Sequence, residues 1–114
     1  MKLVTAIFKP SRLDAVIDAL GEVGVSGLTV SEVRGYGRQQ GKTEVYRGAE
    51  YEVRLLPKVK VEVACAAGDA ERVLEAIAGA ANTGTIGDGK VFVVDIESIL
   101  RIRTGERNEQ AIGS

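Results

Sequence analysis

Histidine and tryptophan are absent from this 114-residue sequence, and cysteine occurs once, as Cys65. With no histidine and a single thiol, the usual zinc sites have almost no ligands and no intrachain disulfide can form. The commonest general base is also missing, and no pair of acidic residues has convincing catalytic spacing. These absences argue against a zinc protein and a disulfide-bonded secreted protein, and we expect a reducing, cytoplasmic compartment.

Aromatic residues and excess charge are scarce as well. The sequence has two phenylalanines and three tyrosines, and its 15 lysines and arginines nearly balance 16 aspartates and glutamates. Most nucleic-acid and anionic-membrane binders rely on net positive charge, and RNA-binding modules also need stacking aromatics. The segment RGYGRQQG, residues 34–41, begins like an RNA-recognition strand but lacks the aromatic residues that should follow. We therefore expect no nucleic-acid partner.

Long hydrophobic runs are also missing. The N-terminal apolar run, residues 3–8, ends at Lys9 and Pro10 before it reaches the length of a signal or membrane-spanning segment. The pattern therefore predicts no segment that spans a membrane.

The patterned parts of the sequence predict alternating strands and two helices. Strand patterns cover residues 2–8, 28–34, 58–65 and 90–96, with a short fifth strand at 100–103. The first helix begins near Ser11, which has capping-box spacing to Asp14. Gly24 and Gly27 mark its exit. Asp69 is a candidate N-cap for the second helix.

Two consecutive strand–helix–strand units predict an α+β fold, a ferredoxin-like double split βαβ sandwich with two helices on one face of the sheet. We expect one such domain over residues 1–114, with Cys65 in its core. The strands at 3–8 and 91–94 are apolar on both sides, although the helices cover only one face. We therefore expect the second face to be buried against other copies, in a homo-oligomer.

About twenty residues without a sustained period lie between Gly37 and Pro57, and they include YRGAEY, residues 46–51. A loop this long in a compact domain is usually functional. The alternative is an extended hairpin with arms at 44–46 and 51–53 around Gly48. The pattern leaves the mobile loop and the hairpin equally open.

The segment TGTIGDGKV, residues 83–91, has P-loop spacing until its last position, where Val91 replaces the Ser or Thr that binds magnesium. A helix precedes it and a strand follows, the reverse of the P-loop context. Its glycines still let backbone amides converge on an anion, and Lys90 adds a positive charge. The alternative is an ordinary glycine turn between helix and strand.

Arg101 and Arg103 form a second cationic feature. On a strand, alternation would place both guanidinium groups on one face, with Ile102 on the other. Two such groups suit phosphate oxygens. Together with Lys90, they predict a cationic pocket in a chain whose net charge is near zero.

These segments together resemble the PII family of nitrogen-regulatory signal proteins, from the first strand to the C-terminal tail. YRGAEY resembles the family's modification signature at the tip of its T-loop, here about residues 37–57. TGTIGDGKVFV resembles the second signature, in the B-loop, about residues 82–90. RIRTGERNEQAI is similar to the family's C-terminal loop, here about residues 101–114.

The resemblance implies a homotrimer that binds ATP or ADP in the cleft between each pair of neighbouring subunits. The residues implied to bind the nucleotide are Gly27, Thr29, Gly35, Gly37, Arg38, Gln39, Ala64, Gly87, Asp88, Gly89, Lys90, Arg101 and Arg103. The last two would reach in from the adjacent subunit. Asn82 and Thr85 stand where the family has arginine and often lysine, which leaves nucleotide discrimination open.

The resemblance also implies an effector, 2-oxoglutarate. In the family it binds through a magnesium ion that ATP and the amide oxygen of Gln39 hold. Lys58 would pair with an effector carboxylate, and Gly41 would lie beside it. An amide oxygen is a suitable hard ligand for magnesium, and a lysine supplies charge to a carboxylate.

By the same resemblance, Tyr51 is the site of nucleotidylylation by a nucleotidylyltransferase. Arg47 would be the residue that blocks the channel of an ammonium transporter. Binding to this transporter would recruit the chain to a membrane. The expected function is a sensor of ATP, ADP and 2-oxoglutarate that acts through its T-loop on nitrogen-metabolism partners, including the regulation of glutamine synthetase. The alternative is a small trimeric enzyme that hydrolyses nucleotides.

Overall fold

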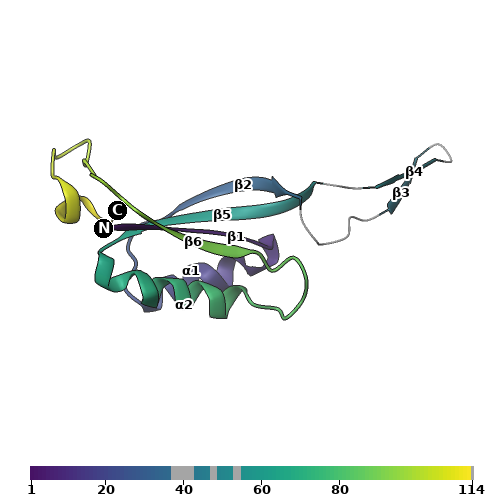
Figure 1. Ribbon diagram of the computed structural model, residues 1–114, viewed down its shortest axis with the longest axis horizontal. Helices are drawn as coiled ribbons and strands as arrows, with labels where there is room; N and C mark the ends of the chain where they lie inside the picture. The colour runs from purple at the N-terminus through teal and green to yellow at the C-terminus, as the bar shows by residue number, and fades with distance from the viewer. Residues whose placement is uncertain (37–42, 47–48, 53–54, 114) are drawn as a thin grey trace.

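The computed structural model describes residues 1–36, 43–46, 49–52 and 55–113, with the backbone alone for 43–46 and 49–52. In this part of the chain, four antiparallel strands form one sheet in the order β2-β5-β1-β6, and two helices cover one of its faces (Figure 1). The elements are β1 (Lys2–Phe8), α1 (Leu13–Glu22), β2 (Thr29–Gly35), β3 (Thr43–Tyr46), β4 (Ala49–Glu52), β5 (Leu56–Cys65), α2 (Ala70–Ala81) and β6 (Lys90–Asp95). This order confirms the predicted α+β, ferredoxin-like split βαβ fold.

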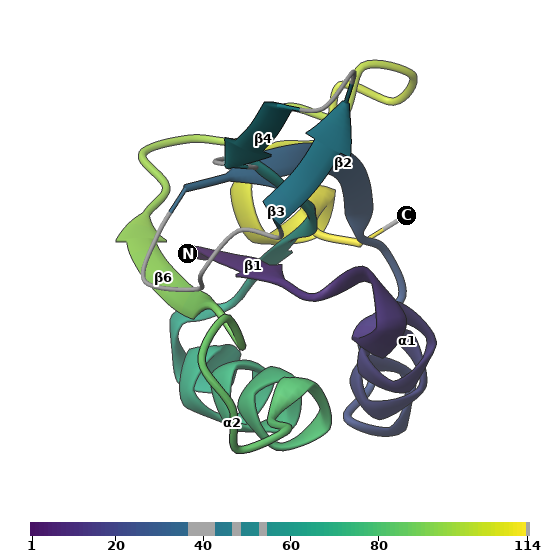
Figure 2. The ribbon, with the colours of Figure 1, turned by 90° about the vertical axis from the view of Figure 1, so that its right-hand side faces the viewer.

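The core lies between the sheet and the helices, and strand alternation explains its composition. Val4 of β1 lies opposite Val63 of β5, so the inward residues of both strands share one face. Helices α1 and α2 pack beneath that face (Figure 2). The largest fully buried side chains are Val4, Phe8, Val16, Leu20, Val61, Val63, Val73 and Ile77, each of which contributes about 1.5–3 kcal/mol on burial. Cys65 belongs to this core as predicted, and burial raises the pKa of its thiol.

The starts of both helices differ from the predicted caps. A short 3-10 helix precedes each of them, at Pro10–Arg12 and at Ala67–Asp69. Ser11 lies inside the first of these turns, so the capping-box prediction was wrong and Arg12 occupies the N-cap of α1. Asp69 does occupy the N-cap of α2 but has helical backbone angles and makes no capping bond; its carboxylate contacts Arg72 at 3.2 Å instead.

The exit of α1 follows the predicted glycine signal. The amide of Val25 donates to the carbonyl of Leu20, and the amide of Gly24 donates to the carbonyl of Gly21. These two bonds define a Schellman motif. This motif needs a left-handed residue, and Gly24 has φ +90°. Glycine at this position therefore ends the helix and turns the chain toward β2.

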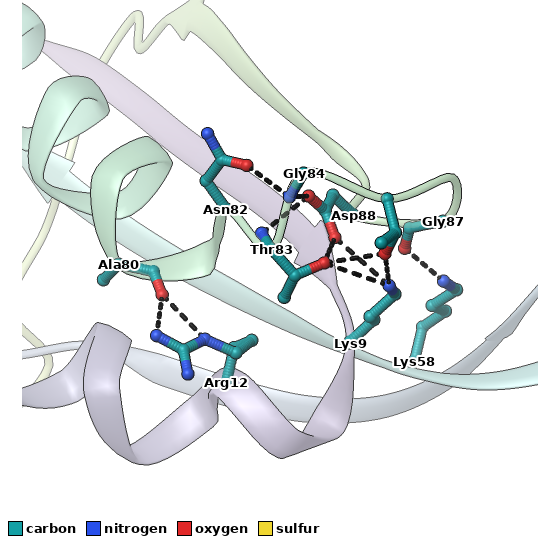
Figure 3. Close-up of polar contacts among 10 residues, drawn as sticks. Lys9, Arg12, Lys58, Ala80, Asn82, Thr83, Gly84, Gly87 and Asp88 are labelled. Atoms are coloured by element: carbon teal, nitrogen blue, oxygen red, sulfur yellow. Dashed lines mark hydrogen bonds and ion pairs between the residues drawn. The ribbon is translucent and has the colours of Figure 1, made fainter.

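Arg12 joins the two helices in a way that its sequence context did not indicate. Its Nε and Nη2 donate to the carbonyl oxygen of Ala80, in the last turn of α2, at 2.9 and 2.7 Å (Figure 3). A charged donor thus satisfies one of the carbonyl groups that the end of a helix leaves unpaired.

Replacing Arg12 with methionine should lower the free energy of unfolding by about 1–2 kcal/mol, because a part-buried, charge-assisted bond is lost. The matched control is Arg72→Met, which removes only an exposed ion pair to Asp69 and should cost at most about 0.5 kcal/mol. Urea titrations at one protein concentration compare the two. Equal losses of stability would show that the Arg12 contact contributes no more than an exposed ion pair.

The predicted fifth strand at 100–103 was wrong. Leu100 forms an isolated bridge to Arg107, and residues 102–104 form a turn. The amide of Gly105 donates to the carbonyl of Arg101 at 2.8 Å, and the amide of Arg101 donates to the carbonyl of Glu106 at 2.9 Å, which closes the turn. Because the chain reverses here, strand alternation does not apply. Arg101 is half-buried and donates to the carbonyl of Ile112 at 3.3 Å, whereas Arg103 is exposed.

The segment between β2 and β5 contains a hairpin. β3 pairs with β4, with Tyr46 opposite Ala49, and Figure 1 shows the hairpin beyond the end of the four-stranded sheet. This confirms the hairpin alternative for the described residues, although its second arm begins at Ala49 rather than at Tyr51. Residue Gly48, the proposed centre of the turn, lies outside the described part of the chain.

No described helix or strand covers the sheet face opposite α1 and α2 in the single chain (Figure 1). Phe92 and Val94 of β6 point to this open face and are 48% and 52% exposed. Their register partners on β1, Thr5 and Leu3, share the face. None of the described helices has both the length and the apolar character needed to cross a bilayer.

Candidate functional site

An open cleft of about 780 Å³ lies at the end of the sheet where β1 and β2 end and β5 and β6 begin. It collects glycines, two lysines and several apolar side chains. Its lining residues are Ile7, Gly35, Tyr36, Leu56, Lys58, Thr85, Ile86, Gly87, Asp88, Gly89, Lys90 and Phe92. The sequence-predicted residues Gly35, Lys58 and 87–90 are therefore brought together at one site.

The B-loop forms one wall of this first cleft, and Asp88 organises it. The carboxylate accepts bonds from the backbone amides of Thr83 at 2.7 Å and Gly84 at 2.9 Å, and also from the Thr83 hydroxyl (Figure 3). Bonds from Thr83, opposed in part by burial, hold the pKa of Asp88 well below its ordinary value. The side chain of Asn82 adds a bond to the Gly84 amide at 2.7 Å. The amides of residues 83 and 84 thus face this carboxylate, so an added anion has to bind nearer to residues 87–90.

Two lysines reach the B-loop from neighbouring strands. Lys58 of β5 donates to the carbonyl of Gly87 at 2.6 Å, and Lys9, just after β1, lies 3.2 Å from a carboxylate oxygen of Asp88 (Figure 3). Burial lowers the pKa of Lys58, the nearby charge of Lys9 lowers it further, and Asp88 acts in the opposite direction. The cleft thus holds positive charge next to glycine backbone, which suits a phosphate or a carboxylate.

Gly89 brings the loop into direct contact with β1. Its φ is +98°, and a Cβ built on it would lie 1.8 Å from the carbonyl oxygen of Ile7. Only glycine allows the chain to approach this strand so closely in this conformation. Lys90 follows as the first residue of β6, opposite Ile7, and its side chain is exposed at the cleft.

A second open cleft, of about 470 Å³, lies at the other end of the same sheet, where β1 and β2 begin and β5 ends. Its lining residues are Leu3, Gly27, Leu28, Thr29, Glu62, Ala64 and Gly113. Three residues implied to bind nucleotide, Gly27, Thr29 and Ala64, lie here rather than in the first cleft. Glu62 is a polar neighbour that the sequence analysis did not single out.

Arg101 and Arg103 belong to this second end as well. The C-terminal segment lies at the end of the molecule that also holds the N-terminus, opposite the end that carries the B-loop (Figure 1). The predicted cationic pocket of Lys90 with the two arginines therefore does not form within one chain. The described residues that were expected to bind one nucleotide fall into two sets at the two ends of the sheet.

The remaining predicted residues are not placed. Gly37, Arg38, Gln39, Gly41 and Arg47 lie outside the described part of the chain. Tyr51 lies on β4, of which only the backbone is described. Their roles stay predictions. Among the described residues, no group of three or more acidic or cysteine side chains is arranged to hold a metal ion.

Sequence reasoning missed Tyr36 and Phe92, which line the first cleft, and Lys9, which contacts the B-loop. Phe92 had a usable signal, because alternation from Val91, which packs on the core, places it on the open face. Lys9 had none, since its partners Thr83, Thr85 and Asp88 come more than seventy positions later in the chain.

Comparison with known proteins identifies a family for this chain and agrees with its fold. The family model "Nitrogen regulatory protein P-II" matches residues 1–106. A nitrogen regulatory protein P-II from Rhizobium meliloti is 60% identical over 112 residues, which cover 98% of this chain and all of the relative. With the same coverage, the P-II protein of Pasteurella multocida is 56% identical and the nitrogen regulatory protein GlnK of Escherichia coli K12 is 54% identical. The chain therefore belongs to the nitrogen regulatory protein P-II family.

Proposed function

We propose that this chain is a nitrogen-regulatory signalling protein that binds ATP or ADP in a site shared by two neighbouring copies. The observation that supports this most is the division of the expected nucleotide residues. Gly35 and residues 87–90 lie at one end of the sheet, while Thr29 and Ala64 lie at the other. The C-terminal segment that carries Arg101 and Arg103 is also at that second end (Figure 1). Neither set alone makes a complete nucleotide site.

The described residues fit a nucleotide when the two ends meet. The first cleft supplies Lys58, Lys90 and close-approaching glycine backbone for phosphate oxygens. The C-terminal loop of the neighbour supplies Arg103, whose side chain is exposed, and Arg101. Apolar Ile7 and Phe92 give the wall of the cleft a surface for a purine ring.

Contact between unlike ends is heterologous, and a heterologous interface generates a ring when its rotation closes. The trimer implied by the family resemblance is such a ring. It would also cover the exposed Phe92 and Val94 of the open face, which a single chain leaves in water. We therefore propose that the ring and the nucleotide site form together.

We further propose that 2-oxoglutarate and magnesium join the ATP-bound site, with Lys58 pairing with an effector carboxylate. Lys58 is half-buried in the first cleft and already donates to a B-loop carbonyl. Titration calorimetry tests this: 2-oxoglutarate should bind more tightly with magnesium-ATP than without it. Equal binding would count against the sensor, and steady ATP turnover at enzymatic rates would favour the hydrolase alternative.

The adjacent glutamines Gln39 and Gln40 offer a matched test of the magnesium ligand. Gln39→Ala should abolish 2-oxoglutarate binding in the presence of magnesium-ATP and leave ADP binding largely intact, because ADP binding does not depend on an amide oxygen that holds magnesium. Gln40→Ala should change neither. Loss of ADP and effector binding together in Gln39→Ala would refute the assignment.

The output segment would be the T-loop, about residues 37–57. Occupancy of the cleft would bias this segment, since β2 and β5 lead from Gly35 and Lys58 directly into it. Arg47 would dock in an ammonium transporter, and a nucleotidyl group on Tyr51 would prevent docking by bulk and charge. Measuring co-purification with a transporter, with and without 2-oxoglutarate, tests this output.

A further inference from the structure

Lys9 is the basic residue that contacts the B-loop most extensively among those described. Its ammonium lies 3.2 Å from Asp88 Oδ1, 3.2 Å from Thr83 Oγ1 and 2.5 Å from Thr85 Oγ1. These oxygens belong to both halves of the loop, before and after its tip at Ile86 and Gly87. One side chain, only 22% exposed, therefore holds the loop closed from the inside.

The position of Asp88 makes this contact important for binding an anion. A carboxylate in the loop fixes the amides of residues 83 and 84, but its negative charge repels a phosphate that approaches residues 87–90. Lys9 supplies a compensating charge at hydrogen-bonding distance. It does so without occupying the cleft, since the residues that line the cleft include Asp88 and Thr85 but not Lys9.

We propose that Lys9 is a positioning residue for nucleotide binding: it clamps Thr83, Thr85 and Asp88 together and offsets the Asp88 charge, so that the B-loop is ordered and able to accept phosphate. This inference rests on the proposed nucleotide-binding function. It assigns to Lys9 no direct contact with the ligand, and Thr85 acts with it as a neutral oxygen partner.

Lys58 provides an independent sensor of this arrangement. It lines the same cleft, bonds to Gly87, and is influenced by the charges of Lys9 and Asp88, with Lys90 also facing the cleft. Removing the positive charge of Lys9 should raise the pKa of Lys58, which a simple loss of packing would not do.

The experiment compares Lys9→Met with Lys9→Arg and with Lys2→Met, which removes a lysine that pairs with Asp95 at the other end of β1. Lys9→Met should weaken ADP binding about tenfold, speed amide hydrogen exchange at Thr83 and Gly84, and raise the Lys58 pKa followed by side-chain NMR. Lys9→Arg should recover most of the affinity, and Lys2→Met should change none of these. Thr85→Val, which keeps the ion pair, should weaken ADP binding and speed amide exchange to a smaller extent and leave the Lys58 pKa unchanged, and it serves if Lys9→Met does not fold.

The outcomes separate this inference from the function on which it rests. If the unsubstituted protein binds ADP and Lys9→Met binds it equally well, the positioning role is wrong and the proposed function stands. If the unsubstituted protein does not bind ADP, the proposed function fails, and with it the role of Lys9 in nucleotide binding. Amide exchange in the ligand-free protein still shows whether Lys9 orders the loop.

Discussion

Replacing Gly89 with alanine should lower the free energy of unfolding by roughly 2–5 kcal/mol. The new methyl group would lie 1.8 Å from the carbonyl oxygen of Ile7, 2.8 Å from its carbonyl carbon and 3.0 Å from the Cα of Phe8. An overlap with backbone costs about 1–3 kcal/mol. The positive φ of +98° adds about 1–2 kcal/mol for any L-residue.

Gly84→Ala separates the two contributions. Gly84 lies in the same loop with φ +77°, but a Cβ there would meet no atom within 4 Å. This variant should therefore cost only the conformational part, about 1–2 kcal/mol. Denaturant unfolding at a fixed subunit concentration compares them, because the stability of an oligomer depends on concentration. Equal costs would mean that the loop moves away from β1 without penalty.

Gly89→Ala should also weaken nucleotide binding more than Gly84→Ala. The substitution can be accommodated only if residues 88–90 move away from β1, and these residues are proposed to meet the phosphates. Lys90 would then lose its place opposite Ile7. Calorimetry with ADP measures this effect on whichever protein remains folded after the substitution.

Reversing the charge of either proposed phosphate ligand should reduce ADP affinity by roughly 10- to 100-fold, because charge-assisted bonds contribute about 1.5–3 kcal/mol. The two variants are Lys90→Glu, at the first cleft, and Arg103→Glu, on the C-terminal loop. Both side chains are exposed, so the free energy of unfolding should hardly change. This matters because it separates lost binding from lost folding.

Arg107→Glu is the matched control for Arg103→Glu. Arg107 is exposed in the same C-terminal segment, where its backbone pairs with Leu100. It is not among the residues proposed to contact the nucleotide, so its reversal should leave ADP affinity nearly unchanged. A similar loss in both variants would indicate a general electrostatic effect, and unchanged affinity in Arg103→Glu would remove the C-terminal loop from the site.

Much of the fold could be predicted because its strands and helices have strong periods. The alternation around Val61 identified β5, and the stripe ending at Ala81 identified α2, since one buried face imposes each period. The strand predicted at 100–103 was wrong because the three alternating residues 101–103 give the same pattern in a strand and in a turn. The predicted cap at Ser11 was wrong because the chain enters α1 through a 3-10 turn, which residue type alone does not indicate.

The candidate site was predictable only in part, because its components meet through tertiary structure. The glycines of the B-loop are visible as a motif, yet Asp88 turns out to organise the loop from within. Lys9 contacts that loop across most of the chain length, which no local pattern reveals. The expected nucleotide-binding residues divide between the two ends of the sheet, and seeing this required the strand order, since the division depends on where β1, β2 and β5 begin and end.

The central claim is that each nucleotide site needs two copies of the chain, and mixing tests it most directly. Lys90→Glu and Arg103→Glu subunits, each deficient alone, are unfolded and refolded together in equal amounts, and high-affinity ADP sites are counted. A site is intact where a subunit with normal Lys90 meets a neighbour with normal Arg103, so random mixing in a closed ring should restore about a quarter of the unsubstituted number. No restored high-affinity sites, in rings shown to contain both variants, would contradict the shared site.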